Sequence, residues 1–316
     1  MIGVESVQRV LVTGAGGFIG RHLTRQLATG NDVVAGSARA LGGATDVTPQ
    51  AQGGGATPIT AKLLESVDVV VHLAGLAHAG AQGASRSELF AVNVDQSVAL
   101  YRLAAAAGVK RFIFLSSIKV LGDSSAMPLA VSAPYAPADD YAASKVAAEC
   151  ELLSLATGAT MLYIVRPPLV YGPGVRANFL TLLRLGLSPW PLPVREADSP
   201  RAWLSVDNLV DLLALLIQLD ELTARGIWHV RDAQQASVAD MLALIACSAG
   251  RNPRQWSCPK WVLAAAARLA RQPHIVPRVL GSLPVDMSET QRLLHWRPPV
   301  AQAQAVAEVV QWYLRR

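Results

Sequence analysis

The chain has 316 residues, of which 52% are apolar, and a formal net charge of +5. This length supports a large buried core, in one dominant domain with a smaller partner. The longest apolar stretch, residues 212–217, is too short to span a bilayer, and the first residues lead into a strand without a cleavable signal. We therefore expect a cytoplasmic protein without a membrane span.

The positive charge comes from 23 arginines against five lysines. The arginines are dispersed rather than gathered in a basic run or aromatic-interleaved stripe, so we place most of them on solvated helix faces and expect no nucleic-acid partner. Three widely spaced cysteines, Cys150, Cys247 and Cys258, predict a reducing compartment and buried thiols. Metal-ligand spacing is missing among the cysteines and the six histidines, so no metal is expected.

A glycine-rich turn follows the first predicted strand, residues 7–12, and opens a helix. Its sequence is Thr13-Gly14-Ala15-Gly16-Gly17-Phe18-Ile19-Gly20. Gly14, Gly17 and Gly20 have the G-x-x-G-x-x-G spacing of a dinucleotide-binding turn, in which glycine lets the backbone approach a pyrophosphate at a helix N-terminus. A tight turn without a ligand is the alternative, but the strand before it and the helix after it favour a nucleotide.

The second predicted strand, residues 33–36, ends in Ser37-Ala38-Arg39. An NAD-type fingerprint places a carboxylate about 20 positions after the glycines to hold the ribose 2′-hydroxyl, and none stands here. Ser37 and Arg39 can accommodate a 2′-phosphate instead, so the cofactor is NAD or NADP with a preference for NADP. In the alternative, Arg39 only stacks on adenine. Residues 42–58 are rich in Gly and Ala, so a third strand is poorly marked.

Further strand-like runs at residues 69–73, 111–116, 162–166 and 227–230 alternate with helical patterns. This alternation predicts an α/β fold, a doubly wound parallel sheet with helices on both faces. His72 falls in a buried strand and is expected to be a packed core residue rather than a ligand.

Hydroxyl groups close the strand at residues 111–116, where Ser116 and Ser117 follow Leu115. Sites in parallel sheets lie at the carboxyl ends of strands, so Ser117 is a candidate for orienting a substrate oxygen. A serine that merely closes the strand by local hydrogen bonding is the alternative.

Tyr141 and Lys145 lie four residues apart at the start of a predicted helix, residues 141–156, which Asp139 or Asp140 can cap. That spacing puts both side chains on one helix face. A tyrosine hydroxyl titrates near ~10, so it needs a lowered pKa to exchange protons at neutral pH, and an adjacent ammonium supplies this. Tyr141 is therefore the predicted acid/base, and Lys145 is also placed to hold a ribose hydroxyl.

Prolines become dense after Arg166 and suit a substrate-binding lid over the strand ends. We expect residues 1–166 to form a dinucleotide-binding domain to which residues 202–230 return. Residues 167–201 and 231–316 would form a smaller C-terminal α/β substrate-binding domain, with helices at 237–250 and 259–271.

Together these motifs resemble the extended short-chain dehydrogenase/reductase family, in particular its nucleotide-sugar branch of UDP-glucose 4-epimerases and 4-ketosugar reductases. Other carriers of the resemblance are Val71-His72-Leu73-Ala74-Gly75, Asn93, Arg166-Pro167-Pro168-Leu169-Val170-Tyr171-Gly172-Pro173-Gly174 with Asn178-Phe179, and Val206-Asp207-Asn208-Leu209. Residues 116–120 and 166–174 look most like a subgroup linked to UDP-N-acetyl-6-deoxyhexose formation.

The resemblance implies two sets of binding residues. The cofactor set is Gly14, Gly17, Phe18, Ile19, Gly20, Ser37, Arg39, Leu73, Ala74, Gly75, Asn93, Ser116, Tyr141, Lys145, Pro167 and Leu169. The substrate set is Ser117, Tyr141, Asn178, Arg201 and Arg278. Arg201 stands in a segment like the family segment whose arginine binds the nucleotide-sugar phosphate, and the guanidinium fork suits a diphosphate.

Two departures from the family pattern bear on the expected reaction. Leu121 stands where epimerases usually carry Tyr, and Ser117-Ile118-Lys119 lacks the Asp-Glu pair of dehydratases. The resemblance implies redox chemistry at C4 of a UDP-sugar, by 4-keto reduction or 4-epimerisation, with dehydration ranked below. A non-catalytic dinucleotide sensor is the other alternative, although such proteins typically lack the Tyr-Lys pair.

Helices at 96–107 and 141–156 can form a two-fold four-helix dimer interface, as in relatives, with core packing as the alternative.

Overall fold

A computed structural model describes residues 7–37, 57–76, 84–219, 226–269 and 280–316. The chain divides into two compact units. The first comprises Met1–Val120, Tyr135–Arg166 and Leu212–Trp228, and the second comprises Leu121–Pro134, Pro167–Asp211 and His229–Arg316. Residues 121–134, 202–211 and 229–230 thus lie with the second unit, whereas the sequence-based division placed them with the first.

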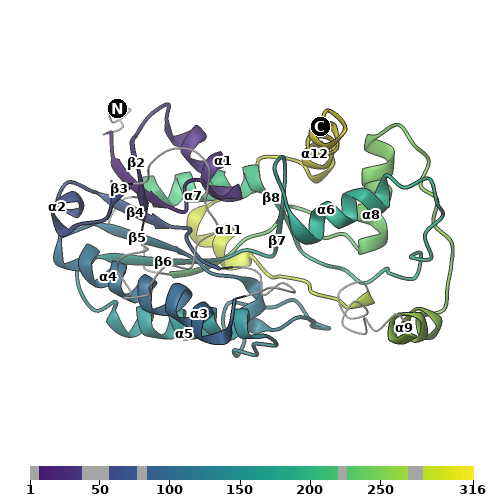
Figure 1. The fold of residues 1–316 in the computed structure, drawn as a ribbon, viewed down its shortest axis with the longest axis horizontal. Coiled ribbons are helices and arrows are strands. Elements are labelled where there is room, and N and C mark those ends of the chain that lie inside the picture. Colours follow the sequence, from purple (N-terminus) through teal and green to yellow (C-terminus); the bar gives the residue numbers. More distant parts are fainter. Residues whose placement is uncertain (1–6, 38–56, 77–83, 220–225, 270–279) are drawn as a thin grey trace. The chain divides into compact units, whose positions relative to one another are not determined.

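The first unit is built on a seven-stranded sheet in the order β3-β2-β1-β4-β5-β6-β9 (Figure 1). The strands are β1 Arg9–Thr13, β2 Asp32–Ser37, β3 Thr57–Pro58, β4 Val69–His72, β5 Arg111–Leu115, β6 Met161–Arg166 and β9 Gly226–His229. Strand order changes direction at β1 and β4, which creates the switch point where open α/β sheets bind ligands. The predicted doubly wound parallel fold is confirmed.

Short apolar runs make these strands, because parallel strands covered by helices are buried on both faces. All four residues of β4 are buried, and the core on one face joins Leu11, Val70 and Phe112 to Leu152 of a covering helix. The helices of this unit are α1 Phe18–Leu27, α2 Ala61–Leu64, α3 Arg86–Phe90, α4 Gln96–Ala106 and α5 Asp140–Leu155, and α7 Val206–Gln218 contributes its second half.

The second unit holds a small parallel sheet of β7 Leu169–Tyr171 and β8 Trp203–Ser205. Its other helices are α6 Ala177–Gly186, α8 Val238–Ser248, α9 Lys260–Leu269, α11 Ser288–Leu294 and α12 Gln302–Leu314. Helix α8 packs against both α6 and α12. The Tyr171 and Phe179 rings stack with centroids 4.8 Å apart, which ties β7 to α6.

A buried polar cluster fastens the start of α7 within the second unit. The Asn208 amide donates to the Asp232 carboxylate at 2.8 Å and to the Val300 carbonyl at 3.0 Å, and it accepts from the Val300 N–H at 2.8 Å. Tyr171 also donates to Asp232, at 2.7 Å. Within the Asp-Asn motif at residues 207–208, Asn208 therefore has a structural role, because it holds α7 to residues 232 and 300.

Two of the three thiols are exposed, so the prediction that all three are buried is wrong. Cys258 is buried, whereas Cys150 and Cys247 are exposed. On α5 the inward side is marked by Lys145, Glu149 and Leu152, and the helical turn of about 100° per residue points Cys150 outward. Among the helices that the structure describes, none combines the length and apolarity needed to cross a bilayer.

Candidate active site

The glycine turn after β1 packs directly on the chain that follows β4. Gly14 has a φ of +71°, in the left-handed region, and a Cβ there would lie 2.9 Å from the Ala74 backbone nitrogen. A Cβ at Gly20 would lie 2.2 Å from the Gly14 carbonyl oxygen. Both positions require glycine, because a side chain at Gly14 would push the turn away from Ala74 and a side chain at Gly20 would push α1 away from the turn.

The N-terminus of α1 is prepared for an anion. Gly17, the residue that precedes the helix, makes no side-chain capping bond, and the first turn carries no acidic residue. The helix dipole and its unpaired N–H groups favour a negative group at this end. The turn therefore fits a dinucleotide pyrophosphate, and this fit rests on backbone geometry rather than on the motif alone.

Asn93 joins three parts of the site from a buried position in a π-helical turn, η1 Ala91–Asp95, between α3 and α4. Its Oδ1 accepts from the Leu76 N–H at 2.9 Å, and its Nδ2 donates to the Leu76 carbonyl at 3.1 Å and to Ser144 Oγ at 2.9 Å. A Cβ on Gly75 would lie 3.0 Å from Asn93 Oδ1 and 3.4 Å from Lys145 Nζ. Gly75, Asn93 and Lys145 therefore meet at one point.

Lys145 is 5% exposed and holds the end of β5. Its ammonium donates to the Leu115 carbonyl at 2.9 Å and lies 4.5 Å from the centroid of the Phe114 ring. Burial lowers the pKa of Lys145 to about 8, and the Glu149 carboxylate acts in the opposite direction. The ammonium is thus charged at neutral pH, but only by a narrow margin.

Tyr141, the predicted acid/base, and Ser117, the serine expected to orient a substrate oxygen, interact in the first unit. Loss of solvent around the half-buried phenol raises the pKa of Tyr141 to about 12, and a hydrogen bond with Ser117 acts in the opposite direction. The expected lowering of this pKa by an adjacent ammonium is therefore wrong for this structure. Desolvation dominates, and Tyr141 carries its proton at neutral pH.

The first turn of α5, which carries Tyr141, is fixed at its start. The Asp139 carboxylate caps the helix by accepting from the Ala142 N–H at 2.7 Å and also pairs with the Lys119 ammonium. Capping by Asp139 was one of two predicted options, and it is the observed one. The Lys119 N–H in turn donates to Ser117 Oγ at 3.3 Å, which links the cap to the serine.

His72 is buried in the core as predicted. It is 1% exposed, and its imidazole lies 2.7 Å from Thr13 Oγ1 and 2.9 Å from Ser97 Oγ. Burial, assisted by the Lys145 charge, lowers the pKa of His72 to about 3, so the ring is neutral. This chain of side chains ties the end of β1 to β4 and α4, and thereby fixes Gly14 against Ala74.

Ser116, a predicted cofactor residue, has its hydroxyl turned to a buried carboxylate. It donates to Glu149, which also pairs with Arg166. The sequence-based reasoning missed Glu149, although Tyr141, Lys145 and Glu149 recur at intervals of four on α5. That interval was the available signal, and it predicts one shared helix face.

Of the remaining predicted residues, Ser37 lies in the first unit, several others lie in the second unit, and two lie outside the described residues. Asn178 is exposed at the start of α6, Pro167 is buried, and Leu169 is 39% exposed. Arg201 donates from Nη1 to the Gly281 carbonyl at 2.6 Å, and burial lowers its pKa while Asp123 opposes this. Ser37 is partly buried and is the last residue of β2. Arg39 and Arg278 lie outside the described residues.

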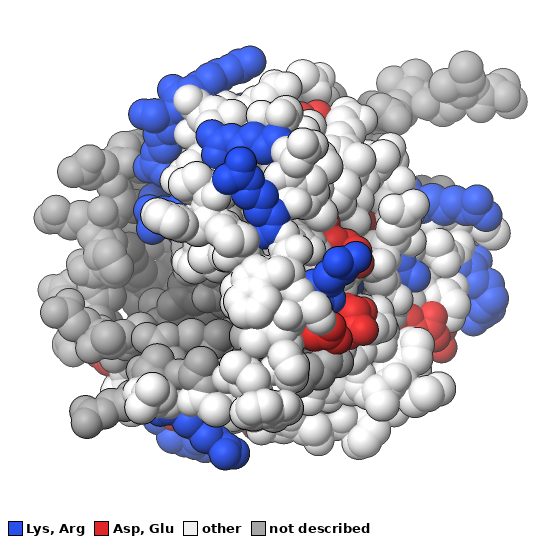
Figure 2. Space-filling model, turned by 90° about the vertical axis from the view of Figure 1, so that its right-hand side faces the viewer, with Lys and Arg blue, Asp and Glu red and all other residues white. Residues whose placement is uncertain are grey.

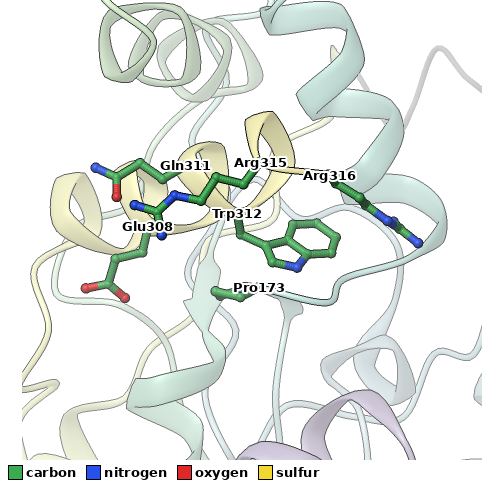
Figure 3. Close-up of a pocket in the computed structure, with 6 residues that line it drawn as sticks. All are labelled: Pro173, Glu308, Gln311, Trp312, Arg315 and Arg316. Atoms are coloured by element: carbon green, nitrogen blue, oxygen red, sulfur yellow. The ribbon is translucent and has the colours of Figure 1, made fainter.

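A separate pocket of about 500 Å³ lies beside α12 in the second unit (Figure 3). It is lined by Pro173, Glu308, Gln311, Trp312, Arg315 and Arg316. The Arg316 guanidinium lies 5.3 Å from the centroid of the Trp312 ring and covers one side of it. None of the predicted site residues lines this pocket, so it is not the candidate active site.

Basic side chains on the face seen in Figure 2 fall into separate groups, and acidic side chains lie beside some of them. Within the described residues of that face, they form no continuous basic stripe. In the same described ranges, no cluster of three His, Cys, Asp or Glu side chains could hold a metal ion.

Comparison with known proteins finds a family profile and relatives that match this chain. The profile of the NAD dependent epimerase/dehydratase family matches residues 10–230. A Vibrio cholerae protein named UDP-glucose 4-epimerase is 34% identical over 314 residues, which cover 97% of this chain and 95% of that protein. GDP-6-deoxy-D-mannose reductase of Pseudomonas aeruginosa is 26% identical over 252 residues, 76% of this chain and 79% of that protein.

The fold also matches solved structures. MoeE5 in complex with UDP-glucose and NAD aligns with a TM-score of 0.74 at 23% identity, over 97% of this chain and 99% of that one. At this identity the likeness concerns the fold. It agrees with the order of strands in the sheet described above.

Proposed function

The chain belongs to the NAD-dependent epimerase/dehydratase family, and we propose that it carries out NAD(P)-dependent redox chemistry at C4 of a UDP-linked hexose or 6-deoxyhexosamine. The reaction is either reduction of a 4-keto sugar or 4-epimerisation. The observation that carries the proposal is that Tyr141 and Lys145 lie one turn apart on α5, with Lys145 beside Asn93 and Gly75, in the unit that holds the glycine turn.

A dinucleotide would be held by the first unit. Its pyrophosphate suits the N-terminus of α1 at residues 14–20, and Lys145 and Asn93 lie together where a ribose can be hydrogen-bonded. When bound, the dinucleotide would supply hydride-transfer chemistry at C4, with the reduced nicotinamide as donor and the oxidised nicotinamide as acceptor. The absence of a side chain at Gly75 lets this backbone approach Lys145 and Asn93 closely.

Tyr141 handles the proton on the C4 oxygen. In ketone reduction its hydroxyl donates that proton, and in epimerisation it first removes the proton and later returns it. A pKa of about 12 keeps Tyr141 protonated at neutral pH, the form that reduction requires. Ser117 would orient the same oxygen through its hydroxyl.

Relatives support both reactions. The Vibrio cholerae relative is named for an epimerisation and the Pseudomonas aeruginosa relative for a reduction. Because one set of residues can serve both, the choice depends on whether the sugar arrives as a ketone or as an alcohol. Elimination ranks below, since Ser117-Ile118-Lys119 carries no Asp-Glu pair.

We assign the cofactor preference to NADP. Strand β2 ends in Gly36-Ser37 without a carboxylate that would hold a ribose 2′-hydroxyl and repel a 2′-phosphate. Arg39, the proposed phosphate partner, follows two residues later. Arg39→Ala should weaken NADPH binding much more than NADH binding in fluorescence titrations, and equal losses would show that Arg39 only stacks on adenine.

We also propose a homodimer formed through α4 and α5. These two helices pack against each other in the first unit, and α5 exposes Leu153 to 44%. Two copies of the pair would make a four-helix bundle that buries such side chains.

A direct assay separates the candidate reactions. Purified protein is given a UDP-4-keto sugar with NADPH or NADH, and in parallel UDP-glucose or UDP-N-acetylglucosamine without net cofactor change. Consumption of reduced cofactor with the ketone supports a reductase, and an isomerised sugar at constant cofactor supports an epimerase. Tight dinucleotide binding with turnover of neither substrate class would instead support the sensor alternative.

A further inference from the structure

A buried ion pair lies behind the proposed acid/base site. Glu149 is 0% exposed and Arg166 is 2% exposed. The Arg166 fork donates from Nε to Glu149 Oε1 at 3.0 Å and from Nη2 to Oε2 at 2.6 Å. Burying two charges is costly unless their geometry is good, and this bidentate geometry meets that condition.

Two hydroxyls complete the surroundings of the Glu149 carboxylate. Ser116 donates to Oε1, and Tyr135 donates to Oε2 at 2.8 Å. The Arg166 guanidinium also lies 5.3 Å from the centroid of the Tyr135 ring. Each carboxylate oxygen thus accepts from Arg166 and from one hydroxyl. The Glu149 side chain therefore joins α5 to β6, to the end of β5 and to the segment before α5.

The cluster touches the site at two points. Ser116 immediately precedes Ser117, and its N–H donates to the Val165 carbonyl at 2.8 Å, so the Glu149 bond fixes the residue from a second side. Glu149 also follows Lys145 by one helical turn on α5. Its position therefore affects both the serine that meets Tyr141 and the lysine beside Asn93.

We propose that Glu149 is a positioning residue for the proposed acid/base site. It holds Ser116, and through it Ser117, in place against Tyr141, and it keeps a negative charge one turn from the Lys145 ammonium. This inference rests on the proposed function, because a positioning residue presupposes an active site. Its first test, however, needs neither substrate nor cofactor.

Several groups face Lys145, and their charges differ. From its own helix come Tyr141, which is protonated, and the Glu149 anion, while β4 presents the neutral His72. The π-helical turn contributes the uncharged Asn93, and Arg166 on β6 is bound to Glu149. Since burial favours the neutral amine, removal of the Glu149 charge must lower the pH at which Lys145 loses its proton.

Nuclear magnetic resonance of ¹³C-labelled lysine measures this directly, because the chain has only five lysines. Lys145→Arg assigns the signal. In the unmodified protein the Lys145 midpoint should lie below those of the other four lysines. Glu149→Gln should lower it by about one pH unit, whereas Glu149→Asp, which keeps the charge, should leave it near its original value.

Glu151→Gln is the matched control, since Glu151 is an exposed carboxylate on the same helix and its removal should leave the Lys145 midpoint unchanged. An unchanged midpoint in folded Glu149→Gln overturns the electrostatic role. If that variant does not fold because Arg166 is left unpaired, Glu149→Gln combined with Arg166→Met removes both charges and should shift the midpoint in the same direction.

Ser116→Ala tests the positioning role separately, because it removes the bond to Glu149 but no charge. The Lys145 midpoint should stay constant while kcat falls about tenfold, with little change in KM for the sugar. A wild-type kcat in this variant overturns the positioning role. Absence of turnover in the unmodified protein would instead count against the proposed function, so the two failures are distinguishable.

Discussion

At the scale of single residues, the Tyr141 hydroxyl is the atom on which the proposed chemistry depends. Tyr141→Phe removes the proton-carrying oxygen and leaves the ring, so turnover should fall about 10²–10⁴-fold while dinucleotide affinity stays nearly constant. Steady-state rates and a cofactor titration measure the two effects. Tyr313→Phe on α12 is the control. A Tyr141→Phe variant that keeps more than about a tenth of the rate would exclude the assigned role.

Lys145 should leave a signature in the pH dependence of stability. Burial lowers its pKa from 10.5 to about 8 in the folded state, so between these values the unfolded chain binds more protons than the folded one. The contribution of Lys145 to the free energy of unfolding therefore rises with pH between about 8 and 10.5. Denaturant titrations across this range should show the rise in the unmodified protein and its loss in Lys145→Met.

Arg201 carries the prediction about the substrate. A charge-assisted bond to phosphate contributes on the order of 1.5–3 kcal/mol, so Arg201→Ala should raise the dissociation constant for UDP tenfold or more. Calorimetry with UDP alone tests this without knowledge of the sugar, and dinucleotide affinity should be unchanged. Arg184→Ala, an exposed arginine of α6, is the control. Unaltered UDP binding would remove Arg201 from the proposed site.

At the scale of elements, the turn between β1 and α1 offers a matched pair of glycines. Gly14 has a positive φ and a Cβ there would meet Ala74, whereas a Cβ on Gly16 would meet nothing within 4 Å. Gly14→Ala should lower stability by at least ~1 kcal/mol and weaken dinucleotide binding, because αL strain and the backbone clash add. Gly16→Ala should leave both nearly unchanged. Thermal unfolding measures the stability of the two variants, and a cofactor titration measures their dinucleotide affinity. Equal losses in both variants would contradict the packing argument.

The elements that sequence reasoning located are those with strong local signals. β4 is a buried run of valines, and the interval between Tyr141 and Lys145 marks one face of α5. β3 was obscured because it has only two residues, Thr57–Pro58. Such a strand is specified by its neighbour β2 in the folded sheet rather than by its own pattern.

The surroundings of Glu149 were beyond local reasoning for a different reason. Its partners Arg166, Ser116 and Tyr135 stand 17, 33 and 14 residues away and meet only in the folded chain. The direction of the Tyr141 pKa shift was missed likewise, because desolvation depends on what encloses the phenol. Residue types and spacing indicated the reactive groups, while burial determined their protonation.

At the scale of the whole molecule, the proposed dimer can be tested with two exposed cysteines. Cys150 lies on α5, within the proposed interface, and Cys247 lies on α8 in the other unit. Cys150→Arg places a charge where two copies of α5 would meet and should convert the dimer to a 33.5 kDa monomer in sedimentation experiments. Cys247→Arg should sediment like the unmodified protein. A monomeric unmodified protein would contradict the proposal.

The amide of Asn208 has a consequence for synthesis of the chain on the ribosome. It is bound to Val300, 92 positions later, through both its oxygen and its nitrogen. A nascent chain that has not reached residue 300 cannot satisfy these groups, whereas the strands β1 to β6 end at Arg166 and can pair much earlier. The sheet of the first unit should therefore form during translation, and the second unit should close only after release of nearly the entire chain.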